Sequence, residues 1–235
     1  MTLKAVFLDV GNTLVRESPS RFEIYAGAAS SRGVDVSSKA MLSLMREAHA
    51  ELPLRIDGAY RYSDPWFAAY IRRIFIDKLA LPAREANAIQ KELFAAFEDP
   101  ATFHLYPGAI ELFEGIRGLG LGLGIISNWS ARLPRVLSGL GIEGCFDFVL
   151  CSAIEEMEKP QPEIFREALE RAGVAPRNAL HAGDHPEKDV AAAESVGIEG
   201  VLVDHVRRYE DEPTGTSFRA IGLPDLMVYI SRKSR

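Results

Sequence analysis

The sequence predicts an α/β fold, a doubly wound parallel sheet that is interrupted by an all-helical insert. Short continuous apolar runs recur along the chain, and from residue 101 onward helical patterns separate them. Residues 18–100 carry helical patterns without a clear strand. Strands that alternate with helices favour a parallel sheet covered by helices on both faces. The predicted sheet domain therefore comprises residues 1–17 and 101–235, and the predicted insert comprises residues 18–100.

The predicted strands are largely apolar, which is typical of strands buried on both faces. The first begins at Lys4 and is closed by Asp9 and the residues that follow it. Four more runs predict strands at 123–127, 146–152, 179–182 and 200–203. Together these runs indicate a Rossmann-like sheet.

Spacing predicts the helices of the sheet domain. Apolar residues recur at i, i+3, i+4 and i+7 within 109–116 and within 165–172, which gives each segment one apolar face. Gly173 is a typical helix stop. Pro186 suits a first helical position, and Gly197 suits the end of that helix.

The insert is predicted to be helical for similar reasons. One apolar stripe runs from Met41 to Leu52, with Ser37 or Ser38 as its N-cap. Further helices are predicted to start at Asp64-Pro65 and at Pro82.

Composition narrows the class of protein. Hydrophobic residues make up 47% and charged residues 26% of the 235 residues, which excludes a disordered, collagen-like or disulfide-stapled chain. The formal net charge of −6 disfavours nucleic acid and anionic membranes as partners. No segment resembles a signal peptide or a membrane span. Because the two cysteines, Cys145 and Cys151, are expected to be reduced thiols, the expected location is cytoplasmic.

Chemically useful side chains follow several predicted strands. Asp9 follows the first strand, Ser127 ends the second, and Lys159 comes shortly after the third. Asp184 follows the fourth strand, and Asp189 lies five residues further on. Because ligands of open parallel sheets bind beyond the carboxyl ends of the strands, we expect these side chains to converge.

The charges of these residues predict a metal site. Asp9, Asp184 and Asp189 supply −3 and Lys159 supplies +1, so the local sum is −2. Converging carboxylates repel one another, and a divalent cation would cancel that excess. Mg²⁺ prefers oxygen ligands of this kind.

The same residues carry a resemblance to a known family. The segments Asp9-Val-Gly-Asn-Thr13, Ser127-Asn128, Lys159-Pro160 and Gly183-Asp184-x4-Asp189 resemble the four motifs of the haloacid dehalogenase-like hydrolase superfamily. The helical insert resembles the C1-type cap of subfamily IA. Within that subfamily the chain is similar to the group of rhythmically expressed gene 2-like proteins.

The resemblance implies a role for each matching position. Asp9 would attack a phosphoryl group and form an aspartyl-phosphate that water then hydrolyses. Ser127 and the backbone near Asn128 would bind a phosphoryl oxygen, and Lys159 would neutralise its charge. Thr13 would fix the loop after the nucleophile.

The resemblance also implies a Mg²⁺ cofactor. Asp9, the Gly11 carbonyl and Asp184 would bind the ion, and Asp189 would hold its waters or orient Lys159. The implied substrate is a small phosphorylated molecule.

Position 11 departs from the family pattern. Phosphatases of the superfamily usually carry a second Asp there as general acid and base, and this chain has Gly11. Loss of such a group costs roughly 10²–10⁴-fold in rate. Glu17 and His185 are the nearest substitutes in sequence, although each also suits a solvated or capping role.

Three functions therefore stay open. We rank an atypical Mg²⁺-dependent phosphohydrolase first, a catalytically weak or inactive phosphate-binding protein second, and a 2-haloacid dehalogenase third. A halide leaves without a proton, but that family usually lacks the motif seen at 183–189. A phosphonoacetaldehyde hydrolase would need a cap lysine, and Lys39, Lys78 and Lys91 lie in unconvincing contexts.

Substrate choice is predicted to come from the insert. In related families the loop corresponding to 53–62 faces the active site. Arg55 and Arg61 could bind an anionic substrate group, or they could be surface charges. Tyr60, Tyr62 and Trp66 could line an apolar wall, or they could pack the insert.

Overall fold

The computed structural model describes residues 2–209 and 218–234. Its centre is a six-stranded sheet of order β10-β9-β8-β1-β6-β7 in which every neighbouring pair is parallel. The strands are β1 (Ala5–Leu8), β6 (Gly122–Ser127), β7 (Phe148–Cys151), β8 (Ala179–Gly183), β9 (Glu199–Val203) and β10 (Arg219–Ala220). The predicted α/β class and the five predicted strands are confirmed.

The strand order reverses beside β1. The chain runs from β1 through β6 to β7 on one side, and then from β8 through β9 to β10 on the other. In a doubly wound sheet this reversal creates the crevice in which ligands bind. Asp9 follows β1 and Asp184 follows β8, so both lie at this point.

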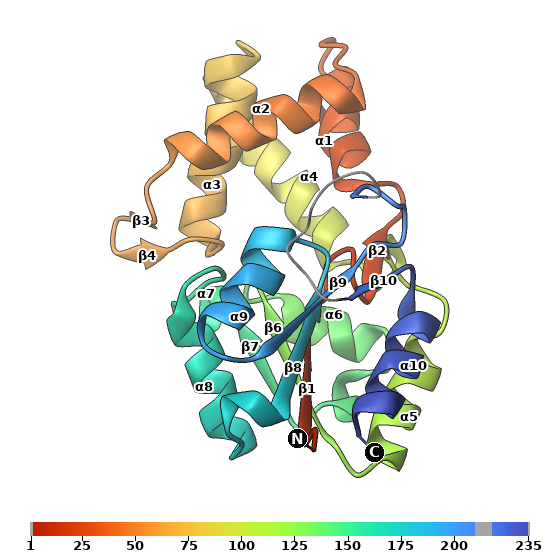
Figure 1. Ribbon diagram of the computed structural model, residues 1–235. Helices are drawn as coiled ribbons and strands as arrows, with labels where there is room; N and C mark the ends of the chain where they lie inside the picture. Colours follow the sequence, from red (N-terminus) through yellow and green to blue (C-terminus); the bar gives the residue numbers. More distant parts are fainter. Residues whose placement is uncertain (1, 210–217, 235) are drawn as a thin grey trace.

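Helices cover both faces of the sheet (Figure 1). In β1, Val6 and Leu8 belong to the core on one face, and Ala5 and Phe7 belong to the core on the other. Both faces of the strand are thus buried, which explains why its apolar run is continuous. The first face is covered by α5 (Ala109–Gly118), α6 (Leu133–Gly139) and α10 (Leu223–Lys233), and the second by α8 (Pro162–Ala172) and α9 (Ala192–Ser195).

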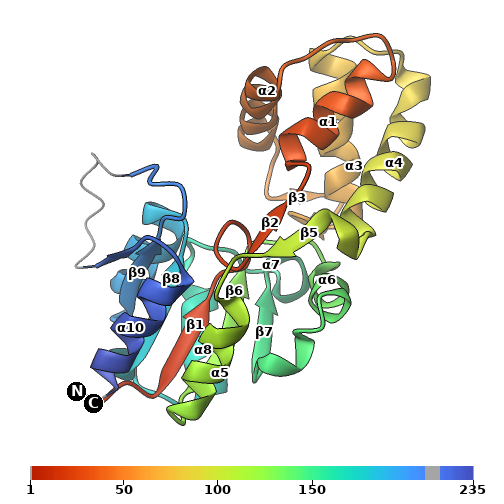
Figure 2. The same ribbon diagram turned by 90° about the vertical axis from the view of Figure 1, so that its right-hand side faces the viewer.

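The helices between β2 and β5 build a separate core that contains Trp66 and Phe75. They stand beyond the carboxyl edge of the sheet, joined to it through β2 and β5 (Figure 2). The elements are β2 (Val15–Glu17), α1 (Arg21–Ser30), α2 (Ser38–Glu51), α3 (Asp64–Arg72), a π-helical segment (Arg73–Lys78), α4 (Ala86–Glu98) and β5 (Phe103–Leu105). The predicted N-cap is found, because Ser37 Oγ accepts a hydrogen bond from the backbone N–H of Ala40. The limits 18 and 100 stay predictions.

One prediction for the insert is wrong, because it contains a β-hairpin. Strands β3 (Arg55–Ile56) and β4 (Ala59–Tyr60) pair antiparallel across Asp57 and Gly58. Both turn residues have positive φ, of 50° and 82°. Asp-Gly is a strong hairpin signal, but strands of two residues are too short to reveal any periodicity.

Short helical elements complete the chain. They are α7 (Ser152–Glu155), the 3₁₀ turns Ala83–Glu85, Pro100–Thr102, Glu143–Cys145 and Pro176–Asn178, and the π-helical segment Pro186–Ala191. The helix predicted from Pro186 therefore starts with π geometry and continues as α9. Among the described residues, no helix combines the length and apolarity that a bilayer crossing needs.

Candidate active site

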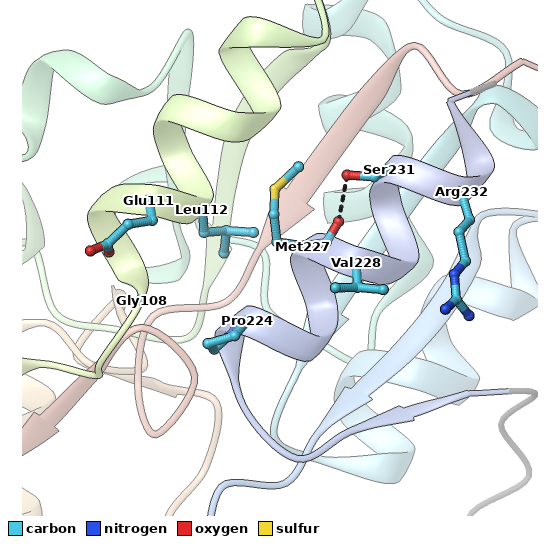
Figure 3. A pocket seen from close by; sticks show the side chains of 8 residues that line it. All are labelled: Gly108, Glu111, Leu112, Pro224, Met227, Val228, Ser231 and Arg232. Atoms are coloured by element: carbon cyan, nitrogen blue, oxygen red, sulfur yellow. Dashed lines mark hydrogen bonds between the residues drawn. The ribbon is translucent and has the colours of Figure 1, made fainter.

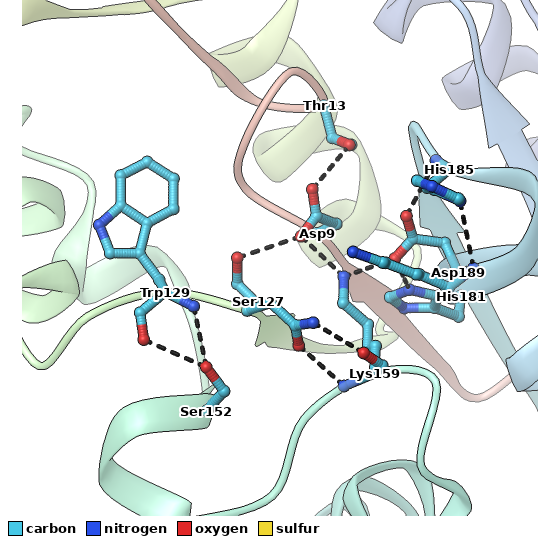
Figure 4. Close-up of polar contacts among 11 residues, drawn as sticks. Asp9, Thr13, Ser127, Trp129, Ser152, Lys159, His181, His185 and Asp189 are labelled. Atoms are coloured by element: carbon cyan, nitrogen blue, oxygen red, sulfur yellow. Dashed lines mark hydrogen bonds and ion pairs between the residues drawn. The ribbon is translucent and has the colours of Figure 1, made fainter. Parts of the chain in front are cut away.

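The side chains predicted at the strand ends meet beyond the carboxyl edge of the sheet, and Figure 4 labels Asp9, Ser127, Lys159 and Asp189 among them. Asp9 is 6% exposed and accepts three hydrogen bonds. Its Oδ1 accepts from Ser127 Oγ at 3.1 Å and from Lys159 Nζ at 2.7 Å, and its Oδ2 accepts from Thr13 Oγ1 at 3.0 Å. The carboxylate is therefore held in one orientation by three separate segments of the chain.

Lys159 is buried among carboxylates. Its Nζ binds both Asp9 and Asp189. Burial opposes the charge of this ammonium, but Asp189 and Asp9 outweigh burial and raise its pKa above the usual range. Lys159 consequently stays a cation beside Asp9.

Asn128 fixes the backbone of Lys159. Its Nδ2 donates to Lys159 O at 2.7 Å, and its Oδ1 accepts from Lys159 N at 2.8 Å. Both ends of the amide are thereby used inside the protein. Likewise, the fully buried Thr13 contacts Asp9. The sequence assigned substrate contact to the region of Asn128 and placed Thr13 in the loop after the nucleophile, but it did not predict these internal partners.

Asp189 receives donors on both oxygens. Its Oδ1 accepts from Lys159 and lies 3.0 Å from His181 Nε2, and its Oδ2 accepts from His185 N at 3.0 Å. Burial opposes ionisation, but Lys159 and His181 outweigh it and lower the pKa. A Cβ at Gly183 would come 2.2 Å from Asp189 Cγ, so only glycine permits this packing.

The sequence did not predict a role for His181. It is fully buried in β8, where it orients Asp189. The available signal was a single imidazole in an apolar strand, two residues before Gly183.

The acidic residues fit a hard divalent cation. Asp9, Asp184 and Asp189 each offer a carboxylate oxygen, and these atoms lie within 4.8 Å of one another. Among the described residues, no donor binds the Asp184 carboxylate. Burial and then the charges of Asp9 and Asp189 raise the pKa of Asp184 to about 7. An oxygen-only donor set with excess negative charge suits Mg²⁺.

The raised pKa of Asp184 predicts how Mg²⁺ affects stability. Because the pKa is higher in the folded protein than in the unfolded chain, ionisation of Asp184 destabilises the metal-free protein as the pH rises toward 7. A Mg²⁺ ion at this site would bind the ionised form and compete with the proton below pH 7. We therefore expect Mg²⁺ to raise Tm more at pH 8 than at pH 5.5, measured by scanning fluorimetry against EDTA.

Asp184→Asn is the matched variant for this measurement. It should be at least as stable as the wild type in EDTA, because it removes a repelled carboxylate. It should also lose most of the Mg²⁺-dependent shift. A Mg²⁺ shift that is equal at both pH values, or that survives in Asp184→Asn, would contradict the metal assignment.

Neither expected substitute acid is free. Arg21 forms an ion pair with Glu17. His185 Nδ1 accepts from the backbone N–H groups of Glu187 and Lys188, so this imidazole caps the π-helical segment. Burial lowers the pKa of His185, which leaves the ring neutral near pH 7.

The cap arginines bind the loop that carries Lys159. Arg55 Nη2 lies 2.6 Å from Glu156 Oε2, and Arg61 Nη1 lies 2.8 Å from Glu158 Oε1. Burial raises the pKa of Glu158, and Arg61 opposes that shift. The sequence left open whether these arginines bind substrate or are surface charges, and it did not predict these partners.

The aromatic residues of the insert mainly pack its core. Trp66 is fully buried, and its Nε1 donates to Pro53 O at 2.9 Å. Tyr62 OH lies 3.1 Å from His49 Nε2. Of the insert lysines, Lys39 and Lys91 are exposed and Lys78 pairs with Glu47 and Glu51.

A separate groove of about 700 Å³ lies between α5 and α10 (Figure 3). Its walls contain none of the residues predicted for the site. It is lined by Gly108, Glu111, Leu112, Pro224, Met227, Val228, Ser231 and Arg232.

Comparison with known proteins agrees with this arrangement. The sequence model described as haloacid dehalogenase-like hydrolase matches residues 3–197. The chain belongs to this family. Haloacid dehalogenase-like hydrolase domain-containing protein 3 of Bos taurus is 32% identical over 208 residues, which cover 86% of this chain and 82% of that protein. The phosphoserine phosphatase of Thermus thermophilus is 29% identical and covers 96% of this chain and 98% of its own length.

The resemblance to the rhythmically expressed gene 2-like group is confirmed. The Drosophila melanogaster protein of that name is 29% identical over 61% of this chain and 58% of its own length. The fold has solved counterparts as well. A haloacid dehalogenase-like phosphatase from Thermococcus onnurineus has a TM-score of 0.68 at 23% identity, covering 97% of this chain and 98% of that one. The chain is thus a haloacid dehalogenase-like hydrolase that is related to phosphatases.

Proposed function

We propose that this hydrolase is a Mg²⁺-dependent phosphohydrolase that acts on a small phosphorylated molecule through an aspartyl-phosphate on Asp9. The observation that carries the proposal is the environment of Asp9. Ser127, Lys159 and Thr13 orient its carboxylate, and Asp184 and Asp189 lie beside it. A relative named phosphoserine phosphatase supports the reaction class.

Two displacements at phosphorus complete the proposed reaction. In the first, an Asp9 oxygen forms a bond to phosphorus while the ester P–O bond breaks and the leaving oxygen keeps the electron pair. In the second, water attacks the same phosphorus, which releases inorganic phosphate and a proton and restores the carboxylate. Ionised Asp9 needs no activating base for the first step.

The surrounding residues stabilise the charge of the transferred group. Ser127 donates a hydrogen bond, and Lys159 supplies a fixed positive charge in a buried place where charge interactions are strong. Asp189 and Asn128 position Lys159. Asp9, Asp184 and the Gly11 carbonyl would hold Mg²⁺ with Asp189 beside them, and the ion would supply positive charge to the phosphoryl oxygens. Arg55 and Arg61 already pair with Glu156 and Glu158, so an anionic substrate would compete with these carboxylates or use the remaining N–H donors.

Gly11 predicts a steep dependence on the leaving group. Without an acid at this position, the leaving oxygen departs unprotonated, so alkyl phosphates should react about 10²–10⁴-fold more slowly than aryl or acyl phosphates, beyond their intrinsic difference. Rates for a series of substituted phenyl phosphates measure this slope. Gly11→Asp should flatten it.

Gly11→Asn is the matched control for that variant. A Cβ at position 11 would come 3.3 Å from Trp129 Cζ3, so both substitutions crowd the same ring. Only the carboxylate can donate a proton to the leaving oxygen. A shallow slope in the wild type would mean that another acid is already present.

A phosphatase assay with p-nitrophenyl phosphate and acetyl phosphate tests the proposal. We expect turnover with Mg²⁺ and its loss in EDTA. Full activity in EDTA would contradict the metal requirement. Chloride release from 2-chloropropionate without phosphatase activity would identify a dehalogenase. Phosphate binding without turnover of a broad phosphorylated-metabolite panel would identify a binding protein.

A further inference from the structure

Arg21 lies close to Gly11, the residue of the nucleophile loop that has no side chain. It is the first residue of α1, and its side chain is 38% exposed. Its Nη2 lies 3.9 Å from the place where a Cβ at Gly11 would be. A guanidinium of the insert therefore lies where the family usually has a carboxylate of the sheet domain.

The ion pair with Glu17 fixes Arg21 and leaves most of its donors free. Nη2 binds Glu17, whose side chain is 9% exposed. In residues 2–209 and 218–234, no other group hydrogen bonds to this guanidinium. Because arginine has five N–H donors, four stay available to a ligand.

The surroundings of Gly11 define what such a ligand meets. The Trp129 ring bounds one side of position 11, and Arg21 bounds another. The backbone N–H of Trp129 is held by Ser152 Oγ at 3.0 Å. An in-line displacement sends the leaving group away from Asp9, and the insert stands beyond the sheet edge that carries Asp9 (Figure 2). The substrate beyond its ester oxygen would thus pass between a flat ring and a guanidinium.

We propose that Arg21 binds a carboxylate on the leaving-group side of the substrate, so that among alkyl phosphates the esters of small hydroxy acids are preferred. The inference rests on the proposed phosphohydrolase function and adds a substrate class to it. A guanidinium matches a planar carboxylate with two parallel hydrogen bonds. Because a guanidinium does not lose its proton in proteins, it cannot replace the missing acid, and its contribution is to binding.

Two pairs of esters that differ in the carboxylate test this inference. They are 3-phosphoglycerate with glycerol 3-phosphate, and phosphoglycolate with ethyl phosphate. The wild type should prefer the acid of at least one pair by roughly 10- to 100-fold in kcat/KM, mainly through KM. Arg21→Gln should remove this preference and leave the neutral ester within about twofold. Arg21→Lys should keep part of this preference, because the lysine ammonium still offers a point charge to the carboxylate.

The controls separate this inference from the proposed function. Arg16→Gln removes an exposed arginine of β2 and should change neither ester. Calorimetric titration of Asp9→Asn with both pairs measures the preference without turnover. Phosphatase activity without any preference for the acids would overturn the Arg21 assignment alone. A preference in binding without turnover would overturn the hydrolase proposal alone. Equal losses on acid and neutral esters in Arg21→Gln would show a purely structural role and overturn the inference.

Discussion

Asp9→Asn is expected to lower phosphatase activity by roughly 10⁴-fold or more while leaving the metal-free protein at least as stable as the wild type. The amide cannot displace an ester oxygen at phosphorus, so the loss falls on kcat. Stability should hold because Lys159 keeps Asp189 as a partner. The substitution also removes one of three crowded carboxylates. Kinetics with acetyl phosphate and thermal unfolding in EDTA measure the two effects.

Asp225→Asn is the matched control for that variant. Asp225 lies in the first turn of α10, on the exposed surface and outside the candidate site. Its loss should leave kcat unchanged. Residual activity of Asp9→Asn above about one percent of the wild type would assign the nucleophile to another residue.

Lys159→Met is expected to destabilise the metal-free protein by about 3–5 kcal/mol and to remove most activity. The variant would bury the carboxylates of Asp9 and Asp189 without their cation. Because Lys159 lowers the pKa of Asp189, its stabilising effect is present above the unfolded pKa of about 4 and is lost as the pH falls. The difference in unfolding free energy between wild type and variant should therefore shrink in acid. Urea unfolding at several pH values measures it.

Lys39→Met provides the comparison, since Lys39 is exposed on the insert. Its unfolding free energy should stay within about 0.5 kcal/mol of the wild type. Mg²⁺ should recover part of the stability that Lys159→Met loses, because the ion compensates the same carboxylates. A Lys159→Met protein as stable as the Lys39 variant would mean that the ion pairs contribute nothing.

The sheet and the convergence of Asp9, Asp184 and Asp189 could be predicted from the sequence, and the reason is physical. Strands buried on both faces need continuous apolar runs, and parallel strands bring their carboxyl ends to one edge. The side chains after β1, β6 and β8 therefore had to lie near one another. Their chemical roles stay predictions until they are measured.

Features that depend on distant partners could not be predicted. Arg55 meets Glu156 across 101 positions, and no local pattern encodes that pairing. Strand β10 has only two residues and shows no periodicity. The position of Arg21 beside Gly11 depends on the direction in which α1 follows β2. The spacing of residues in the sequence does not define that direction.

Covalent labelling of the protein tests the central claim most directly. Wild-type protein with Mg²⁺ and radiolabelled acetyl phosphate should be quenched in acid, digested and mapped by mass spectrometry. We expect a hydroxylamine-sensitive phosphoryl group on the peptide that contains Asp9, and its absence in Asp9→Asn. Turnover that proceeds with no label on Asp9, or with the label on another residue, would contradict the account.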